Sequence, residues 1–66
     1  MKLTVNGDPR TVPEGTTVAG LLEELSLLPT LVVVERNREI IPREKVADVV
    51  LEPGDELELV HFVGGG

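Results

Sequence analysis

The chain has 66 residues, with 12 acidic and 6 basic side chains and a formal net charge of −6. A chain of this length buries only about 60% of its unfolded surface, so it forms at most one domain and has little room for a catalytic cleft. The negative charge argues against nucleic acid as a partner, since phosphate binding requires a basic surface; we expect it to favour solubility or to steer the protein toward basic surfaces of partner proteins.

The first predicted element is a hairpin. Residues 2–5 alternate polar and apolar side chains as a strand does, and residues 10–12 form the expected return strand. Asn6-Gly7 between them accepts the positive φ angles of a tight turn. Pro9 cannot donate to a strand ladder, so we expect an irregular or slightly longer loop at this point.

A single main helix is predicted after the hairpin. Thr16 or Thr17 can begin it by accepting a hydrogen bond from an early backbone N–H. Its apolar stripe has the i, i+3, i+4, i+7 spacing of one helical face. The stripe consists of Val18, Leu21, Leu22 and Leu25. Pro29 is expected to end the segment.

The middle of the chain predicts two more strands and a helical turn. Residues 31–34 are continuously apolar, as in a central strand that is covered on part of both faces. A turn within residues 35–39 leads to a short strand at Ile40-Ile41, and a proline-initiated helical turn is expected near residues 43–48. Further core side chains are expected from Val46, Val49, Val50 and Leu51. Pro53-Gly54-Asp55 predicts another turn.

Residues 56–63 form the last predicted strand. Leu57 and Leu59 point to one side of it. Its other side begins charged and ends apolar, with Glu56, Glu58, Val60 and Phe62 in order. Phe62 is the only aromatic residue and could belong to the core. If the two leucines face the helix, however, Phe62 faces outward and forms a docking patch with Val60.

This order of elements predicts an α+β fold in which a mixed sheet of four to five strands packs on one main helix. With one helix, only one face of the sheet is fully covered. We assign residues 1–63 to this domain and residues 64–66 to a flexible C-terminal glycine tail.

The sequence offers no convincing catalytic or metal-binding cluster. His61 is the single histidine and has no neighbour at ligand spacing, and Ser26 has no base near it. We therefore expect no metal site and no bound cofactor. The absence of cysteine and of a signal-peptide pattern favours a reducing cytoplasm, and no apolar run is long enough to predict a membrane span.

The run Gly64-Gly65-Gly66 is the strongest candidate for a functional site. Because glycine has no side chain, the backbone of Gly64 and Gly65 can enter a narrow channel. The α-carboxylate of Gly66 is ionised at neutral pH and is a poor electrophile, so another enzyme must activate it. The alternative interpretation of these three glycines is that they are a frayed chain end or a residual linker without a function.

Several segments together carry a resemblance to a known family. They are residues 3–7, 12–18, 21–22, 34–37, 40–44 and 51–60, followed by the terminal glycines. In this order they resemble the ThiS family of sulfur carrier proteins, which are ubiquitin-like β-grasp domains. Ile40-Ile41-Pro42-Arg43-Glu44 is the most family-specific internal motif. Arg38 stands where the family usually has glycine, so we expect a different turn type there. Val46 stands where the family commonly has an aromatic residue.

The resemblance implies a carrier rather than an enzyme. An E1-like (ThiF-type) adenylyltransferase would use ATP to activate Gly66, and sulfur from a donor such as a cysteine desulfurase would convert it to a thiocarboxylate. A (ThiG-type) thiazole synthase would then receive the sulfur for the thiazole ring of thiamine. The alternatives are a molybdopterin-synthase small subunit, a carrier for another sulfur-requiring pathway, and a β-grasp interaction module without terminal chemistry.

Overall fold

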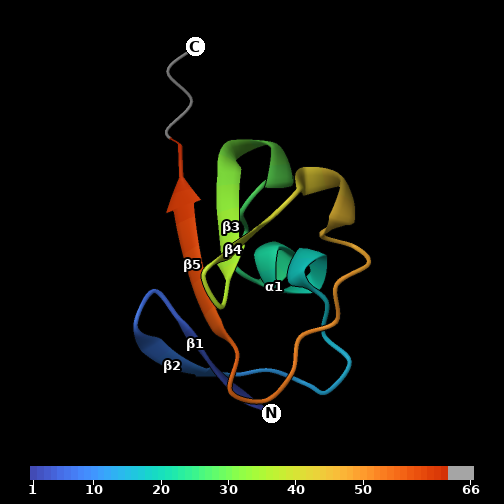
Figure 1. The fold of residues 1–66 in the computed structure, drawn as a ribbon. Helices are drawn as coiled ribbons and strands as arrows, with labels where there is room; N and C mark the ends of the chain where they lie inside the picture. The colour runs from blue at the N-terminus through green and yellow to red at the C-terminus, as the bar shows by residue number, and fades with distance from the viewer. Residues whose placement is uncertain (63–66) are drawn as a thin grey trace.

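A mixed sheet of five strands, in the order β2-β1-β5-β3-β4, forms one layer of the domain (Figure 1). The computed structural model describes residues 1–62; Val63 and the predicted tail of Gly64, Gly65 and Gly66 lie outside the described residues. The elements are β1 Lys2–Val5, β2 Asp8–Thr11, α1 Val18–Glu24, the 3₁₀ turn η1 Pro29–Leu31, β3 Val32–Arg36, β4 Glu39–Ile41, the 3₁₀ turn η2 Arg43–Lys45 and β5 Glu56–His61. The boundary after residue 63 stays a prediction.

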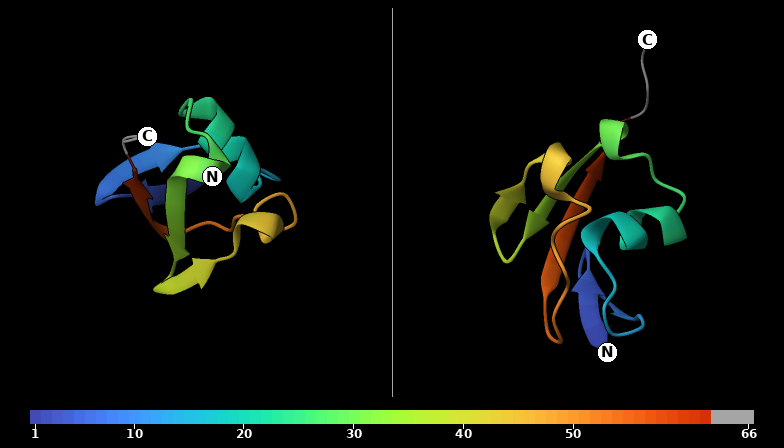
Figure 2. Two further views of the ribbon diagram at one scale, coloured as in Figure 1. Left: turned by 90° about the horizontal axis from the view of Figure 1, so that it is seen from above. Right: turned by 90° about the vertical axis from the view of Figure 1, so that its right-hand side faces the viewer.

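The predicted α+β architecture is confirmed. β1 pairs with β5 in parallel, and the other neighbouring strands are antiparallel. α1 lies across one face of this sheet, and η1 lies close to the C-terminal end of β5 (Figure 2). The hydrophobic core fills the space between the two layers. It consists of Leu3, Val12, Val18, Leu21, Leu22, Val32, Val34, Val46, Leu51, Leu57 and Leu59.

The first hairpin is tighter than the sequence predicted. β2 begins at Asp8, which pairs with Val5, so the loop contains only Asn6 and Gly7. These two residues have φ angles of 50° and 85°, the left-handed values that a two-residue hairpin turn requires. The expected irregular loop is therefore wrong. Pro9 is accommodated because β2 is an edge strand, where a missing N–H donor leaves no inner ladder bond broken.

α1 begins as predicted and ends earlier. The Thr17 hydroxyl accepts a hydrogen bond from the Gly20 amide at 3.0 Å and caps the first turn. The helix ends at Glu24 rather than near Pro29, because Ser26 adopts a φ of 60°. The amides of Ser26 and Leu27 then bond back to carbonyl oxygens of the last turn, at 3.0 Å and 2.8 Å. This is a Schellman cap, with serine in the position that usually holds glycine.

The turn between β3 and β4 corrects another expectation. Asn37 and Arg38 have φ angles of 50° and 72°, so Arg38 adopts the left-handed conformation in spite of its side chain. The pairing of Arg36 with Glu39 leaves a two-residue loop, which requires positive φ at both positions. The prediction that Arg38 would impose another turn type than the left-handed one is therefore wrong. Nearby, η1 rather than a strand contains Leu31, and β3 starts at Val32.

In the segment before β5, the prediction from the sequence was wrong for one side chain. Val46 and Leu51 are buried, as expected, and Val49 packs against the core. Val50 was expected in the core but is 52% exposed. It forms an isolated bridge with Thr17 in an extended segment, where successive side chains point in opposite directions. Since Val49 and Leu51 point inward, Val50 points outward.

Candidate functional site

Two exposed apolar side chains stand at the C-terminal end of β5. Val60 is 55% exposed and Phe62 is 54% exposed, whereas Leu57 and Leu59 are buried against the core. The alternation of a strand explains this difference, because the inward direction of the leucines forces Val60 to the opposite face. Of the two interpretations of Phe62, the structure supports the exposed one.

Neighbouring strands extend this apolar surface. Val33 on β3 lies directly opposite Val60, and Ile40 on β4 is 67% exposed. Val33, Ile40 and Phe62 line a shallow hollow of about 280 Å³, together with Pro29, Thr30, Val32, Ile41, Pro42 and Arg43. We call Val33, Ile40, Val60 and Phe62 the outer apolar patch. Exposed apolar side chains gathered in this way are typical of a protein-binding surface.

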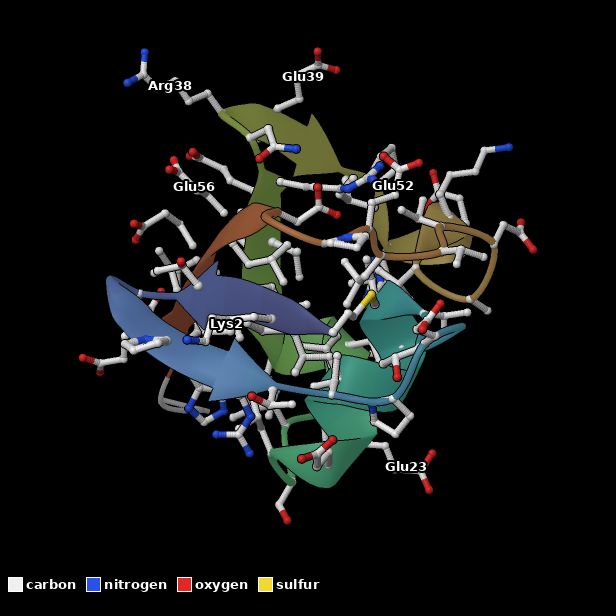
Figure 3. The ribbon with its side chains drawn as sticks, turned by 90° about the horizontal axis from the view of Figure 1, so that it is seen from below. Lys2, Glu23, Arg38, Glu39, Glu52 and Glu56 are labelled. Atoms are coloured by element: carbon white, nitrogen blue, oxygen red, sulfur yellow. The ribbon has the colours of Figure 1, made fainter. Side chains whose placement is uncertain are left out.

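The start of β5 gives the same face of the sheet a negative charge. Glu56 and Glu58 are exposed, and Glu35 on β3 lies directly opposite Glu58. In Figure 3, Glu56 projects on the side of the sheet away from α1, whereas Glu23 projects from α1. The outer face is therefore acidic at the start of β5 and apolar at its end. A partner surface with basic side chains beside an apolar area would complement it.

The end of β5 is held in place by its backbone. His61 pairs with Val32 of β3, and the Phe62 amide donates a hydrogen bond of 2.7 Å to the carbonyl oxygen of Leu31. Phe62 is the last described residue. The predicted stem, Gly64 and Gly65, and the predicted sulfur-carrying residue, Gly66, lie outside the described residues, so their roles stay predictions.

The remaining candidates contribute no catalytic arrangement within the described part of the chain. His61 is exposed and lines a hollow of about 410 Å³ with Arg10 and Leu25, on the opposite side of β5 from Val60. Ser26 caps α1. Residues 1–62 contain no group of three or more His, Cys, Asp or Glu side chains that could hold a metal ion. Over the same residues, no helix is long and apolar enough to cross a membrane.

Asp55 is the buried polar residue that the sequence analysis treated only as part of a turn. Its Oδ2 atom accepts hydrogen bonds from Arg36 Nε and from the Glu52 amide, both at 2.8 Å, and its Oδ1 atom accepts one from Asn37 Nδ2 at 3.1 Å. Burial by itself would raise the pKa of Asp55, but these hydrogen bonds outweigh it and hold the pKa below the ordinary value of 3.8. The carboxylate therefore ties the turn before β5 to the turn after β3.

Comparisons with known proteins agree with this geometry. The ThiS family matches residues 3–66. The sulfur carrier protein ThiS of Bacillus subtilis is 43% identical over 65 residues, which cover 97% of this chain and 98% of that protein. A thiazole synthase of Magnetococcus marinus is 46% identical over 66 residues, but this chain spans only 20% of its length. The crystal structure of the thiamine biosynthesis protein ThiS from Geobacter metallireducens is 40% identical and matches with a TM-score of 0.84, covering 100% of both chains.

Proposed function

The chain belongs to the ThiS family, and on that premise we propose that it is a sulfur carrier that supplies sulfur for the thiazole ring of thiamine. The observation that carries the proposal is the family match over residues 3–66, which includes the three terminal glycines. The proposed reactive group is accordingly the carboxyl group of Gly66. Gly64 and Gly65 serve as a stem without side chains that can enter the active sites of partner enzymes.

The proposed chemistry takes place on that carboxyl group and needs two co-reactants. The Gly66 carboxylate attacks the α-phosphorus of ATP, which forms an acyl adenylate and releases pyrophosphate. Hydrosulfide then attacks the acyl carbon, AMP leaves, and a thiocarboxylate remains after loss of a proton. Activation is required because a free carboxylate is ionised at neutral pH and is a poor electrophile. No side chain of the carrier takes part in these steps, so the protein acts as a co-substrate rather than as an enzyme.

Three partner activities follow from this chemistry. An E1-like adenylyltransferase forms the adenylate, and a thiazole synthase accepts the sulfur. A sulfur donor such as a cysteine desulfurase holds the sulfur as a protein-bound persulfide, and a thiol reductant releases it as hydrosulfide while being oxidised to a disulfide. The thiazole synthase has support from a relative, because the Magnetococcus marinus protein of that name contains a segment similar to the whole of this chain.

The described residues contribute the docking surface. The outer apolar patch includes the last residues of the described chain, and Phe62 precedes Gly64 by only two positions in the sequence, so a partner that binds Val60 and Phe62 holds the chain shortly before the glycines. The acidic side chains on the same face favour a basic partner surface and faster association. The match to the ThiS family favours thiazole formation over the molybdopterin-synthase alternative.

Intact-protein mass spectrometry tests this function. The protein is incubated with a ThiF-type adenylyltransferase, MgATP and sulfide, and the expected product has one oxygen replaced by sulfur. A variant that lacks Gly65 and Gly66 serves as the control and should remain unmodified. Addition of thiazole synthase and its other substrates should then consume the thiocarboxylate. The proposal is wrong if no product forms under conditions in which the same adenylyltransferase modifies the Bacillus subtilis carrier.

A further inference from the structure

Asn6 stands at the point where β5 loses its strand partner on one side. β1 pairs with β5 only through Thr4 with Glu56 and Val5 with Leu57. The chain then turns at Asn6 and runs back as β2, whereas β5 continues to His61. Among the described residues, no strand accompanies β5 beyond Leu57 on the β1 side, although β3 accompanies it on the other.

The side chain of Asn6 takes the place of the missing strand. Its Oδ1 atom accepts a hydrogen bond from the Leu59 amide at 2.7 Å, and its Nδ2 atom donates one to the Leu59 carbonyl oxygen at 3.2 Å. Its backbone amide donates to the Leu57 carbonyl oxygen at 2.8 Å. A side-chain amide offers a donor and an acceptor much as a peptide group does. Asn6 therefore extends the ladder by one step, and its φ of 50° is one that asparagine tolerates.

Leu59 directly precedes Val60, so the backbone that Asn6 holds is the β5 backbone that presents two members of the outer apolar patch, Val60 and Phe62. We infer that Asn6 is a positioning residue, which fixes the C-terminal half of β5 and with it Val60 and Phe62 for docking to partner enzymes. The docking step rests on the proposed function. The fixing of β5 does not, so the two can be tested separately.

Asn37 provides a matched control at the opposite end of the same strand. It has the same φ of 50°, and its Oδ1 atom accepts a hydrogen bond from the Glu56 amide at 3.0 Å. Its Nδ2 atom donates to Asp55, which lies before β5 begins. Asn37 thus makes the same kind of contact with β5 but at the acidic end, away from Phe62.

Amide hydrogen exchange measured by NMR tests the structural step with Asn6→Gly and Asn37→Gly. Glycine keeps the positive φ without strain and removes only the side chain. Loss of an ordinary hydrogen bond changes an opening equilibrium by about five- to tenfold, so the Leu59 and Phe62 amides should exchange faster by about that factor in Asn6→Gly. In Asn37→Gly the Glu56 amide should respond, and the Phe62 amide should stay within about twofold. An unchanged Phe62 amide in Asn6→Gly would overturn the inference.

Steady-state adenylation tests the docking step at a temperature at which both variants are folded. If fewer molecules hold the patch in its binding position, the apparent Kd rises as the inverse of the fraction that does, so Asn6→Gly should raise KM with kcat unchanged, by at most about the five- to tenfold change in the opening equilibrium and by more than Asn37→Gly does. Asn37→Gly should leave KM and kcat within about twofold of the wild-type values, even if its free energy of unfolding falls as much as that of Asn6→Gly. Equal KM increases in the two variants would show a general stability effect and refute the positioning role. If the wild-type protein is not adenylated at all, the proposed function fails while the exchange experiment still decides whether Asn6 fixes β5.

Discussion

Replacement of Phe62 by alanine separates docking from folding. A buried aromatic side chain covers about 150–250 Å², and Phe62 is 54% exposed, so roughly 100 Å² remains for burial against a partner. At about 25 cal/mol per Å², loss of this area weakens binding by about 2.5 kcal/mol, or roughly 50- to 100-fold in Kd. A fully buried phenylalanine costs about 3–5 kcal/mol of folding free energy when truncated. For this half-exposed side chain we expect about 1.5 kcal/mol or less.

Calorimetric titration with the adenylyltransferase gives the Kd, and urea denaturation gives the free energy of unfolding. Val50→Ala is the matched control, because Val50 is 52% exposed but lies on the segment before β5, outside the outer apolar patch. It should leave the Kd within about twofold. A loss of about 3–5 kcal/mol in unfolding free energy for Phe62→Ala, with the Kd unchanged, would refute the reasoning and make Phe62 a core residue.

Three further predictions concern stability and association. Asp55→Asn should lower the free energy of unfolding by about 1–3 kcal/mol at neutral pH, because three donors lose a charged acceptor. The pKa of Asp55 is lower in the folded protein, so its contribution to the free energy of unfolding is complete above the ordinary pKa of 3.8 and is lost as the pH falls through the lowered pKa. Urea denaturation should show that the wild type is no longer more stable than Asp55→Asn at that low pH. A stability difference between the two proteins that does not change with pH would contradict this prediction. Ser26→Gly and Arg38→Gly should each raise the free energy of unfolding in urea by about 0.5–1 kcal/mol, because both residues have positive φ; a decrease would contradict the assigned strain. Glu56→Gln with Glu58→Gln should slow association with a basic partner and flatten its dependence on ionic strength, as stopped-flow measurements can show; an unchanged salt slope would exclude steering by this face.

The features that the sequence predicted correctly depend on neighbouring residues. The alternation along residues 56–62 was sufficient to separate Leu57 and Leu59 from Val60, because the direction of a strand side chain is set by its position alone. The apolar spacing from Val18 to Leu22 likewise identified the buried face of α1. These local patterns also placed Val60 and Phe62 at the surface, which is the exposure that their proposed docking role requires.

The features that were missed depend on residues far apart in the chain. Asp55 contacts Arg36 and Asn37 across 19 and 18 positions, and Asn6 contacts Leu59 across 53. Nothing in the spacing of these residues marks them as partners. The left-handed conformation of Arg38 has the same origin, because the pairing of β3 with β4 imposes a two-residue turn on a residue that alone would avoid it.

The position of β5 in the sheet explains why a carrier would place its reactive end after this strand. β5 lies between β1 and β3, so its backbone is held from both sides, by β3 as far as His61 and by Asn6 at Leu59. An edge strand would be held on one side only. We expect the proposed carrier to dock on its two partner enzymes with the same surface, and a fixed surface loses less freedom on each binding event. Phe62→Ala should therefore weaken binding to the thiazole synthase as well as to the adenylyltransferase; an effect on one enzyme alone would mean that the two recognise different surfaces.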